Sequence, residues 1–189
     1  MIYRPAFVDA DNTAQLLQAV RAEATWEQPR IRVFGREYIT PRFVAWHADP
    51  GCTYRYSGQQ QPWRPWVPAL QKVRELVEKE YGPQHGVLAN LYENGTHSMS
   101  AHADDESDLE PGASVVMVSL GATRRFVLKH RTTKARHVLE IEDGSLLVMA
   151  GRTNTVAVHS VPKTAKPVGP RISLTFRRMA NRGRSMPEP

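Results

Sequence analysis

Two histidines and one carboxylate, His102, Asp104 and His159, are the residues of this sequence whose types and spacing could do chemistry. Only Ala103 separates His102 from Asp104, so in an extended segment both side chains leave the same face and can chelate one ion. Two imidazoles and one carboxylate hold Fe(II) on one side and leave positions open for a cosubstrate and dioxygen. The set predicts a non-haem iron site, although the triplet taken alone also fits an acidic surface turn.

Two arginines share one face of a strand predicted near the end of the chain. Over residues 171–178, Arg171, Ser173, Thr175 and Arg177 alternate with apolar residues. If this face points inward, its guanidinium groups need anionic partners, because an unpaired buried charge is costly. A dicarboxylate such as 2-oxoglutarate, bound bidentately by Arg171, would supply one.

The elements that must position these residues are two helices followed by many short strands. The periodicity predicts a helix from Asp9 to about Ala24 with an acidic N-cap, and a second, amphipathic helix from about Pro65 to Tyr81. Strands are predicted over residues 87–92, 113–120, 124–128, 137–141, 145–149, 155–159 and 171–178, with Gly121, Asp143-Gly144 and Gly151 as turn residues. We expect a mainly β, α+β fold, a jelly roll buttressed by the two N-terminal helices.

Composition restricts the class of protein. A chain of 189 residues is most simply one domain, and a net charge of +6 favours a polyanionic partner. Cys52 is the single cysteine, which excludes an intrachain disulfide and a cysteine-based zinc cluster, so a reducing, intracellular compartment is expected. No apolar run approaches the length of a membrane span, and no basic and apolar leader is seen, so neither a membrane protein nor a secreted one is expected.

Several motifs occur in order along the chain and carry a resemblance to a known family. They are Val33-Phe34-Gly35, Pro41-Arg42, Tyr54-Arg55-Tyr56-Ser57-Gly58, Trp66-Val67-Pro68, Asn90 to Gly95, His102 to Glu106, Val118 to Ala122, His159-Ser160 and Pro170 to Arg177. Together they cover most of residues 31–179, and the sequence resembles the AlkB family of Fe(II)/2-oxoglutarate-dependent nucleic-acid demethylases. It is most similar to the branch that repairs alkylated DNA. The resemblance implies a double-stranded β-helix, the form of jelly roll found in this family.

The resemblance also assigns roles around the predicted metal. It implies that Asn90 and Tyr92 hydrogen-bond the cosubstrate, although Leu88, Asn90 and Tyr92 also fit an ordinary sheet face. It implies that Arg171 binds the distal carboxylate of 2-oxoglutarate and that Arg177 is the second arginine, near the metal end. The family's strand usually carries Asn where this chain has Ser173, whose hydroxyl has less reach than an amide.

Four further residues resemble the family's contacts to nucleic acid. Tyr54 and Tyr56 share one face of a predicted strand, and Tyr56 aligns with an aromatic residue that stacks on an extruded base, although sheet packing would explain both tyrosines. Glu106 resembles an acidic contact to the exocyclic edge of the base; the alternative is one more solvated acid. Phe34 resembles an apolar wedge inserted into duplex DNA, or it ends a buried strand.

The implied reaction is oxidative removal of N-alkyl groups from bases of the 1-methyladenine and 3-methylcytosine type, using Fe(II), 2-oxoglutarate and dioxygen and releasing succinate and formaldehyde. The substrate is alkylated DNA, with RNA as an alternative. Basic residues between two predicted strands and in the loop after His159 are expected to contact phosphates: Lys129, Arg131, Lys134, Arg136, Lys163 and Lys166.

We expect one monomeric domain over residues 1–180, with a recognition segment over 1–86 and the jelly-roll core over 87–180, followed by a flexible tail over 181–189. No partner protein is implied, and the expected location is the cytoplasm or nucleoid of a bacterium or the nucleus of a eukaryote. Two alternatives stay open. One is a hydroxylase of the same class that acts on a protein or small molecule, and the other is a non-catalytic jelly roll that binds nucleic acid.

Overall fold

The computed structural model describes residues 1–33, 36–56 and 59–180 of the chain. Three helices are described: α1 (Ala10–Glu23), α2 (Pro68–Tyr81) and α3 (Gly151–Val156). The strands described are β1 (Ile2–Arg4), β2 (Arg30–Val33), β3 (Arg36–Ile39), β4 (Phe43–Ala48), β5 (Arg55–Tyr56), β6 (Gln59–Gln60), β7 (Gly86–Tyr92), β8 (Met99–His102), β9 (Val115–Gly121), β10 (Arg124–His130), β11 (Arg136–Ile141), β12 (Leu146–Met149), β13 (Ala157–Val161) and β14 (Arg171–Arg177). The predicted tail over 181–189 lies outside the described residues.

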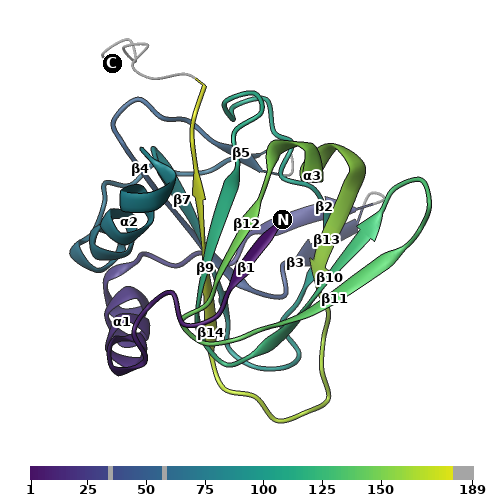
Figure 1. Cartoon of the computed structure of the whole chain (residues 1–189), viewed down its shortest axis with the longest axis horizontal. Coiled ribbons are helices and arrows are strands. Elements are labelled where there is room, and N and C mark those ends of the chain that lie inside the picture. Colours follow the sequence, from purple (N-terminus) through teal and green to yellow (C-terminus); the bar gives the residue numbers. More distant parts are fainter. Residues whose placement is uncertain (34–35, 57–58, 181–189) are drawn as a thin grey trace.

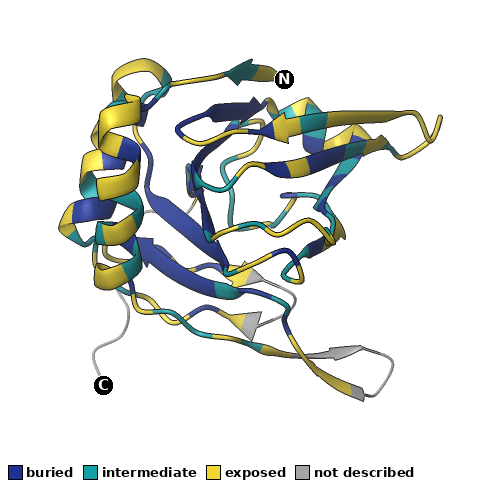
Figure 2. Ribbon diagram, turned by 90° about the horizontal axis from the view of Figure 1, so that it is seen from below, coloured by how far each residue is buried: buried dark blue, intermediate teal, exposed yellow. Residues whose placement is uncertain are grey.

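Two antiparallel sheets form the body of the protein (Figure 1). The large sheet has the order β1-β12-β9-β14-β7-β4, and the small sheet has the order β11-β10-β13-β8. Helices α1 and α2 cover the outer face of the large sheet, with their exposed sides turned outward (Figure 2). The expected jelly roll with two buttressing helices is confirmed. Among the described residues, no helix has the length and apolarity that a membrane crossing requires.

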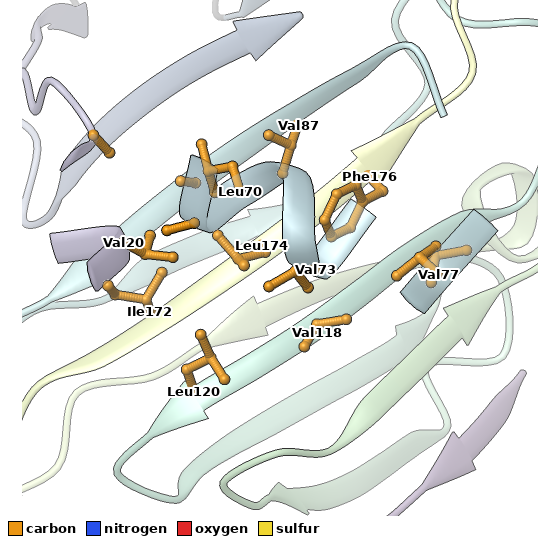
Figure 3. Packing of buried hydrophobic residues seen from close by; sticks show 14 of the residues in the cluster. Val20, Leu70, Val73, Val77, Val87, Val118, Leu120, Ile172, Leu174 and Phe176 are labelled. Atoms are coloured by element: carbon orange, nitrogen blue, oxygen red, sulfur yellow. The ribbon is translucent and has the colours of Figure 1, made fainter. Parts of the chain in front are cut away.

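The main core lies between the large sheet and the two helices (Figure 3). Strand β14 contributes Ile172, Leu174 and Phe176, each fully buried, and α2 contributes Leu70 and Val73 from the opposite side. Burying a side chain of this size stabilises a fold by roughly 1.5–3 kcal/mol. Since side chains alternate along a strand, this packing fixes which face of β14 points away from the helices.

Helix α1 begins as predicted, whereas α2 begins later than predicted. The Asp9 carboxylate accepts a hydrogen bond from the backbone N–H of Asp11 and caps α1. The start of α2 is Pro68 instead of the expected Pro65, because a residue that precedes proline is disfavoured in helical conformation and Val67 is extended (φ −97°, ψ 155°). The backbone N–H of Ala69 is satisfied by a carboxylate of α1.

The predicted strand over 155–159 is wrong at its start. Residues 151–156 form the short helix α3, and the strand β13 runs from 157 to 161. Gly151, expected in a turn, is the first residue of α3 and lies against Gly112; a Cβ atom at Gly151 would approach the Gly112 carbonyl oxygen to 2.7 Å. This contact holds the chain in a helical turn before it enters the small sheet.

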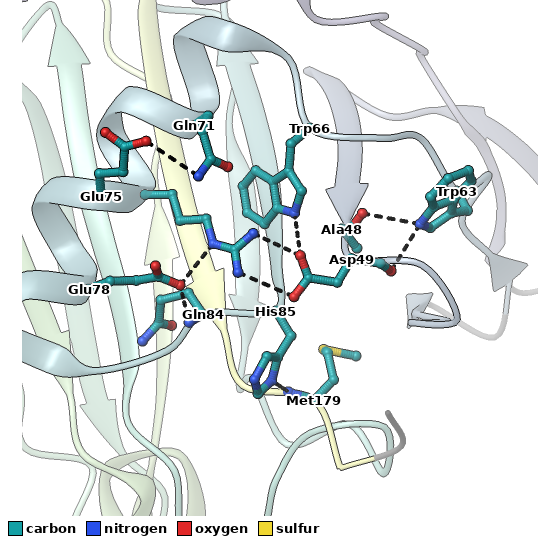
Figure 4. A network of polar contacts seen from close by, with 11 residues as sticks. Ala48, Asp49, Trp63, Trp66, Gln71, Glu75, Glu78, Gln84, His85 and Met179 are labelled. Atoms are coloured by element: carbon teal, nitrogen blue, oxygen red, sulfur yellow. Dashed lines mark hydrogen bonds and ion pairs between the residues drawn. The ribbon is translucent and has the colours of Figure 1, made fainter. Parts of the chain in front are cut away.

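A polar network fixes α2 to the end of strand β4 (Figure 4). The Arg74 guanidinium donates to Asp49 at 2.7 Å and to Glu78 at 2.8 Å, and the Trp66 indole N–H donates to Asp49 at 2.8 Å. Arg74 also stacks over the Trp66 ring, with its guanidinium carbon 4.6 Å from the ring centroid. The network therefore anchors β4, whose residue Trp46 supports the site described below.

Candidate active site

The three predicted metal ligands come together between the two sheets. His102 ends β8 and lies directly across from His159 on β13, with ring centroids 4.2 Å apart. Asp104 follows β8, and its carboxylate oxygens lie 4.0 Å from Nε2 of His102 and 3.7 Å from Nε2 of His159. One ligand atom from each residue lies within 4.8 Å of the other two, so a single ion can be bound by all three.

The charge states of these residues suit a divalent cation. Burial lowers the pKa of His159 to about 4, with the neighbouring His102 adding to the effect, so His159 is neutral at pH 7. Burial alone would raise the pKa of Asp104, but the charges of Arg177 and the two histidines outweigh it, and the pKa is lowered. The Nδ1 atom of His102 lies 2.9 Å from the carbonyl oxygen of Ser100, which leaves Nε2 for the metal when Nδ1 carries the proton.

Arg177 holds Asp104 in position. Its Nη2 donates to the Asp104 carboxylate at 2.7 Å, and both side chains are nearly inaccessible to solvent. The guanidinium carbon also lies 4.9 Å from the centroid of the Tyr54 ring. Arg177 lines the cavity beside the metal ligands, and its Nε is buried without a hydrogen-bond partner among the described residues. Contact between Arg177 and the cosubstrate stays a prediction.

Arg171 fits a bound carboxylate. Its side chain is fully buried, Nε donates to Ser119 Oγ at 2.9 Å, and Nη1 has no hydrogen-bond partner among the described residues. Burial lowers the pKa of Arg171 to about 10, so the group is still charged at neutral pH. A buried cation with an unsatisfied N–H can pair with one carboxylate of a diacid, and contact of Arg171 with 2-oxoglutarate stays a prediction.

Beside the metal ligands lies a cavity with a volume of about 30 Å³. Leu88, Asn90 and Tyr92 line it together, as their shared strand face predicted, and Ser173 lines it from β14. The Tyr92 ring lies 5.4 Å from the guanidinium carbon of Arg171. Asn90 Oδ1 accepts a hydrogen bond from Arg42 at 2.8 Å. The cavity wall therefore combines polar side chains with apolar ones such as Met117. Contact of Asn90, Tyr92 and Ser173 with 2-oxoglutarate stays a prediction.

The predicted nucleic-acid contacts are only partly described. Tyr54 is fully buried and stacks on Trp46 at 4.6 Å between ring centroids, and its hydroxyl donates to Glu106 Oε1 at 2.8 Å. The other carboxylate oxygen, Oε2, is buried without a hydrogen-bond partner among the described residues. In this structure Tyr54 therefore positions Glu106, because its ring has no face open for a base. Tyr56 is described in its backbone alone, and Phe34 lies outside the described residues.

Three buried residues that support the site were not assigned a role from the sequence. Trp46 supports Tyr54, Arg42 holds Asn90, and the Arg124 guanidinium donates to the carbonyl oxygens of Asn94, His97 and Pro162. Arg42 lies in the Pro41-Arg42 motif, which was noted only as part of the resemblance. No local pattern marks the other two, because their partners come from distant segments.

The structure combines two facing antiparallel sheets, a histidine-carboxylate-histidine cluster with open space beside it, and a buried arginine that lacks an anion. This combination defines the class of protein, a non-haem iron oxygenase with a keto-diacid cosubstrate. Residues 1–177 match the family model described as the 2OG-Fe(II) oxygenase superfamily. The chain belongs to this superfamily and, within it, to the AlkB family. It is therefore a dioxygenase that uses Fe(II), 2-oxoglutarate and dioxygen, which excludes the non-catalytic alternative.

The relatives with similar sequences are AlkB homologues, and several of them are named as DNA oxidative demethylases. The human DNA oxidative demethylase ALKBH2 is 37% identical over 180 residues, which are 90% of this chain and 69% of the relative. The cattle protein of the same name is 36% identical, with 90% and 65% covered. The human alpha-ketoglutarate-dependent dioxygenase alkB homolog 3 is 32% identical, with 92% and 64% covered. The chain thus spans about two thirds of the length of these relatives.

The structure titled OsALKBH1 shares the fold. Its TM-score is 0.64 at 20% identity, and the match covers 94% of this chain and 97% of that one.

Proposed function

We propose that this protein is a DNA oxidative demethylase that repairs N-alkylated bases. The relatives named above as DNA oxidative demethylases support this activity. Within the structure, the observation that carries the proposal is the Glu106 carboxylate, which is held by Tyr54 and keeps one buried oxygen without a partner among the described residues. An acceptor of this kind beside the metal ligands suits a substrate that brings a hydrogen-bond donor and a positive charge.

Bases alkylated at a ring nitrogen have both properties. 1-Methyladenine and 3-methylcytosine carry an exocyclic amino group and are cationic when protonated, so a carboxylate can accept from the amino group and attract the charge. The undamaged bases are neutral and gain only the hydrogen bond. Glu106 would thereby favour damaged over undamaged bases once a base has been extruded into the site.

Each site residue then has a distinct task. His102, Asp104 and His159 hold Fe(II), while Arg171 pairs with the far carboxylate of 2-oxoglutarate and orients its keto-acid end. When bound, iron, 2-oxoglutarate and dioxygen together supply the oxidation that converts an N-methyl group to N-hydroxymethyl. That product loses formaldehyde as the bond between carbon and the ring nitrogen breaks; the ring nitrogen keeps the bonding electron pair and the hydroxyl proton leaves to solvent, which restores the neutral base. Arg177 keeps Asp104 ionised and fixed, and Tyr54 and Glu106 place the alkyl carbon.

The basic segments supply the attraction to the phosphate backbone. Lys129, Arg131, Lys134 and Arg136 lie on the β10–β11 hairpin, and Lys163 and Lys166 lie between β13 and β14. Arg131 is already paired with Asp105 at 3.2 Å, so we assign it a smaller share of the phosphate contacts. DNA affinity should fall steeply with salt, and neutral variants of these segments should show a shallower slope.

The test is formaldehyde release from oligonucleotides that carry one 1-methyladenine or 3-methylcytosine, with Fe(II) and 2-oxoglutarate present. We expect turnover with the damaged oligonucleotides and none with undamaged ones, and His102→Ala and Asp104→Ala should abolish it. Succinate formation stimulated by amino acids or peptides, and not by damaged oligonucleotides, would instead identify a protein or small-molecule hydroxylase. Matched DNA and RNA substrates, single- and double-stranded, define the preferred strand.

We further propose that residues 1–180 act as one monomeric domain in the compartment that holds the cell's DNA. The three metal ligands come from one chain and lie close enough to bind one ion, so the metal site among the described residues requires no second copy. Light scattering of the active protein tests this. A stable dimer whose dissociation abolishes activity would contradict it.

A further inference from the structure

A second concave surface lies on the same face of the small sheet as the metal ligand His159. Cross-strand pairing places His102, His159, Leu128 and His137 in one row across β8, β13, β10 and β11. Neighbouring strands are roughly 4.8 Å apart, so His137 lies about 10 Å from His159 along this row. Beyond Leu128 the row opens into a groove lined by residues of the β10–β11 hairpin and of α3, which we call the hairpin groove.

The walls of the hairpin groove are basic. His130, Arg136 and His137 line it from the hairpin, and Arg152 lines it from α3. No acidic residue is among the described residues that line it, and neither arginine has an ion-pair partner within the described part of the chain. The His130 ring is fixed by hydrogen bonds from the backbone N–H groups of Thr132 and Thr133, each 3.2 Å long. The groove is thus built for an anion.

The floor of the hairpin groove is apolar. Leu128, Val156 and Ala157 form it, and Val156 is 43% exposed although it is a large apolar residue. The groove has a volume of about 450 Å³, within the roughly 300–1,000 Å³ of small-molecule sites. A flat apolar floor between unpaired guanidinium groups fits one nucleotide, with its base on the floor and its phosphates at the rim.

We propose that the hairpin groove binds the nucleotide next to the damaged one in a single strand, with Arg136 and Arg152 on the two flanking phosphates. This inference rests on the proposed function, because it describes where the DNA strand runs as it leaves the metal site. It adds Arg152 and the apolar floor to the hairpin charges already considered. The occupant is a nucleic-acid strand, since the groove's charge complements a polyanion and its position continues the row of residues that starts at the metal.

Binding of an undamaged fluorescent nonanucleotide to the full chain, measured by anisotropy over a range of salt concentrations, tests the groove without requiring catalysis. The Arg136→Gln/Arg152→Gln variant removes two phosphate contacts. Its plot of log affinity against log salt should be shallower by about 1.4, from about 0.7 per contact with a single strand. At 0.1 M salt this difference in slope corresponds to about 25-fold weaker binding by the variant than by the wild type. The difference between the two proteins vanishes near 1 M salt.

The matched control is Lys72→Gln/Lys79→Gln, which removes the same charge from exposed positions of α2, across the large sheet. We expect its slope to match that of the wild type. A slope of the groove variant equal to that of this control would overturn the proposal. A second pair tests the floor: Val156→Glu adds a negative charge there and should weaken binding far more than Val156→Gln. Equal effects of the two Val156 variants would exclude an anion in the groove.

Turnover separates this proposal from the proposed function. The ratio of kcat/KM for a damaged pentanucleotide to that for the isolated damaged nucleotide should fall at least tenfold in the Arg136→Gln/Arg152→Gln variant. An unchanged ratio would mean that no neighbouring nucleotide uses the groove. If no formaldehyde is released from any oligonucleotide while the salt slopes behave as expected, the demethylase assignment fails and the groove stands as a nucleic-acid site.

Discussion

Replacing Arg171 by methionine should make the protein more stable without cosubstrate and unable to bind 2-oxoglutarate. The pKa of Arg171 is lowered from 12.5 to about 10 by burial. That difference corresponds to roughly 3 kcal/mol against the charged form in the folded state at neutral pH. Methionine has a similar length and no charge, but it gives up the hydrogen bond to Ser119. We therefore expect a gain of about 2 kcal/mol in the free energy of unfolding of the cosubstrate-free protein.

Thermal unfolding with and without 2-oxoglutarate measures both effects. For a chain of this size, 2 kcal/mol raises Tm by roughly 4–8 °C. Cosubstrate at a hundred times its Kd should stabilise the wild type by about 2.7 kcal/mol and leave the Arg171→Met variant unchanged. The control is Arg124→Met, which leaves the carbonyl oxygens of Asn94, His97 and Pro162 without this donor and should lower Tm. If both variants lose stability equally, Arg171 is a structural residue and the reasoning is refuted.

Three further predictions concern other parts of the site and its support. Asp104→Asn should lower the Tm of the metal-free protein by about 10 °C, since Arg177 would stay buried without its counter-ion at about 3–5 kcal/mol; a change below about 2 °C in calorimetry would contradict this. Tyr54→Phe should reduce kcat/KM for 3-methylcytosine about tenfold or more, because Glu106 loses a hydrogen bond worth about 1.5–3 kcal/mol; unchanged formaldehyde release would show that Glu106 needs no positioning. Burial lowers the pKa of His47 below 6.5, so the stability that it contributes is complete above pH 6.5 and is lost as the pH falls from 6.5 through the lowered pKa of the folded state. Urea unfolding between pH 5 and 7.5 should show this loss in the wild type and a smaller one in His47→Gln.

The elements that could be predicted from the sequence are those encoded by local rules. Asp9 caps α1 because its carboxylate accepts from the free backbone N–H of Asp11, two residues along the chain, so the signal is local. Gly121 ends β9 and Gly144 lies in the turn between β11 and β12, with positive φ of 86° and 68°, which glycine adopts without strain. Strand β14 alternates between apolar and polar residues because each of its faces meets a different environment.

The elements that were missed depend on distant partners. Strand β4 is nearly all buried, so its sequence shows no alternation, and it forms only by pairing with β7. Strand β1 pairs with β12 from the other end of the chain, with Ile2 opposite Val148. The helix α3 replaces the start of a predicted strand because Gly151 packs against Gly112. Such contacts cannot be read from a local window of sequence.

The chemistry of the candidate site could be predicted because its residues depart from the local patterns that ordinary strands follow. The contacts that hold these residues in place add detail that the sequence does not show. Arg171 and Arg177 lie at the two ends of the buried strand β14, where burying their charges costs free energy unless each has an anionic partner. Strand β14 therefore indicates a functional site. The structure adds that Arg42 Nε donates to Asn90 Oδ1 at 2.8 Å. Since Arg42 donates to that oxygen, the Asn90 amide nitrogen is the group left to donate to a ligand. A nitrogen donor there suits an oxygen of the keto acid, and Asn90→Asp, which removes it, should raise KM for 2-oxoglutarate while keeping the contact to Arg42.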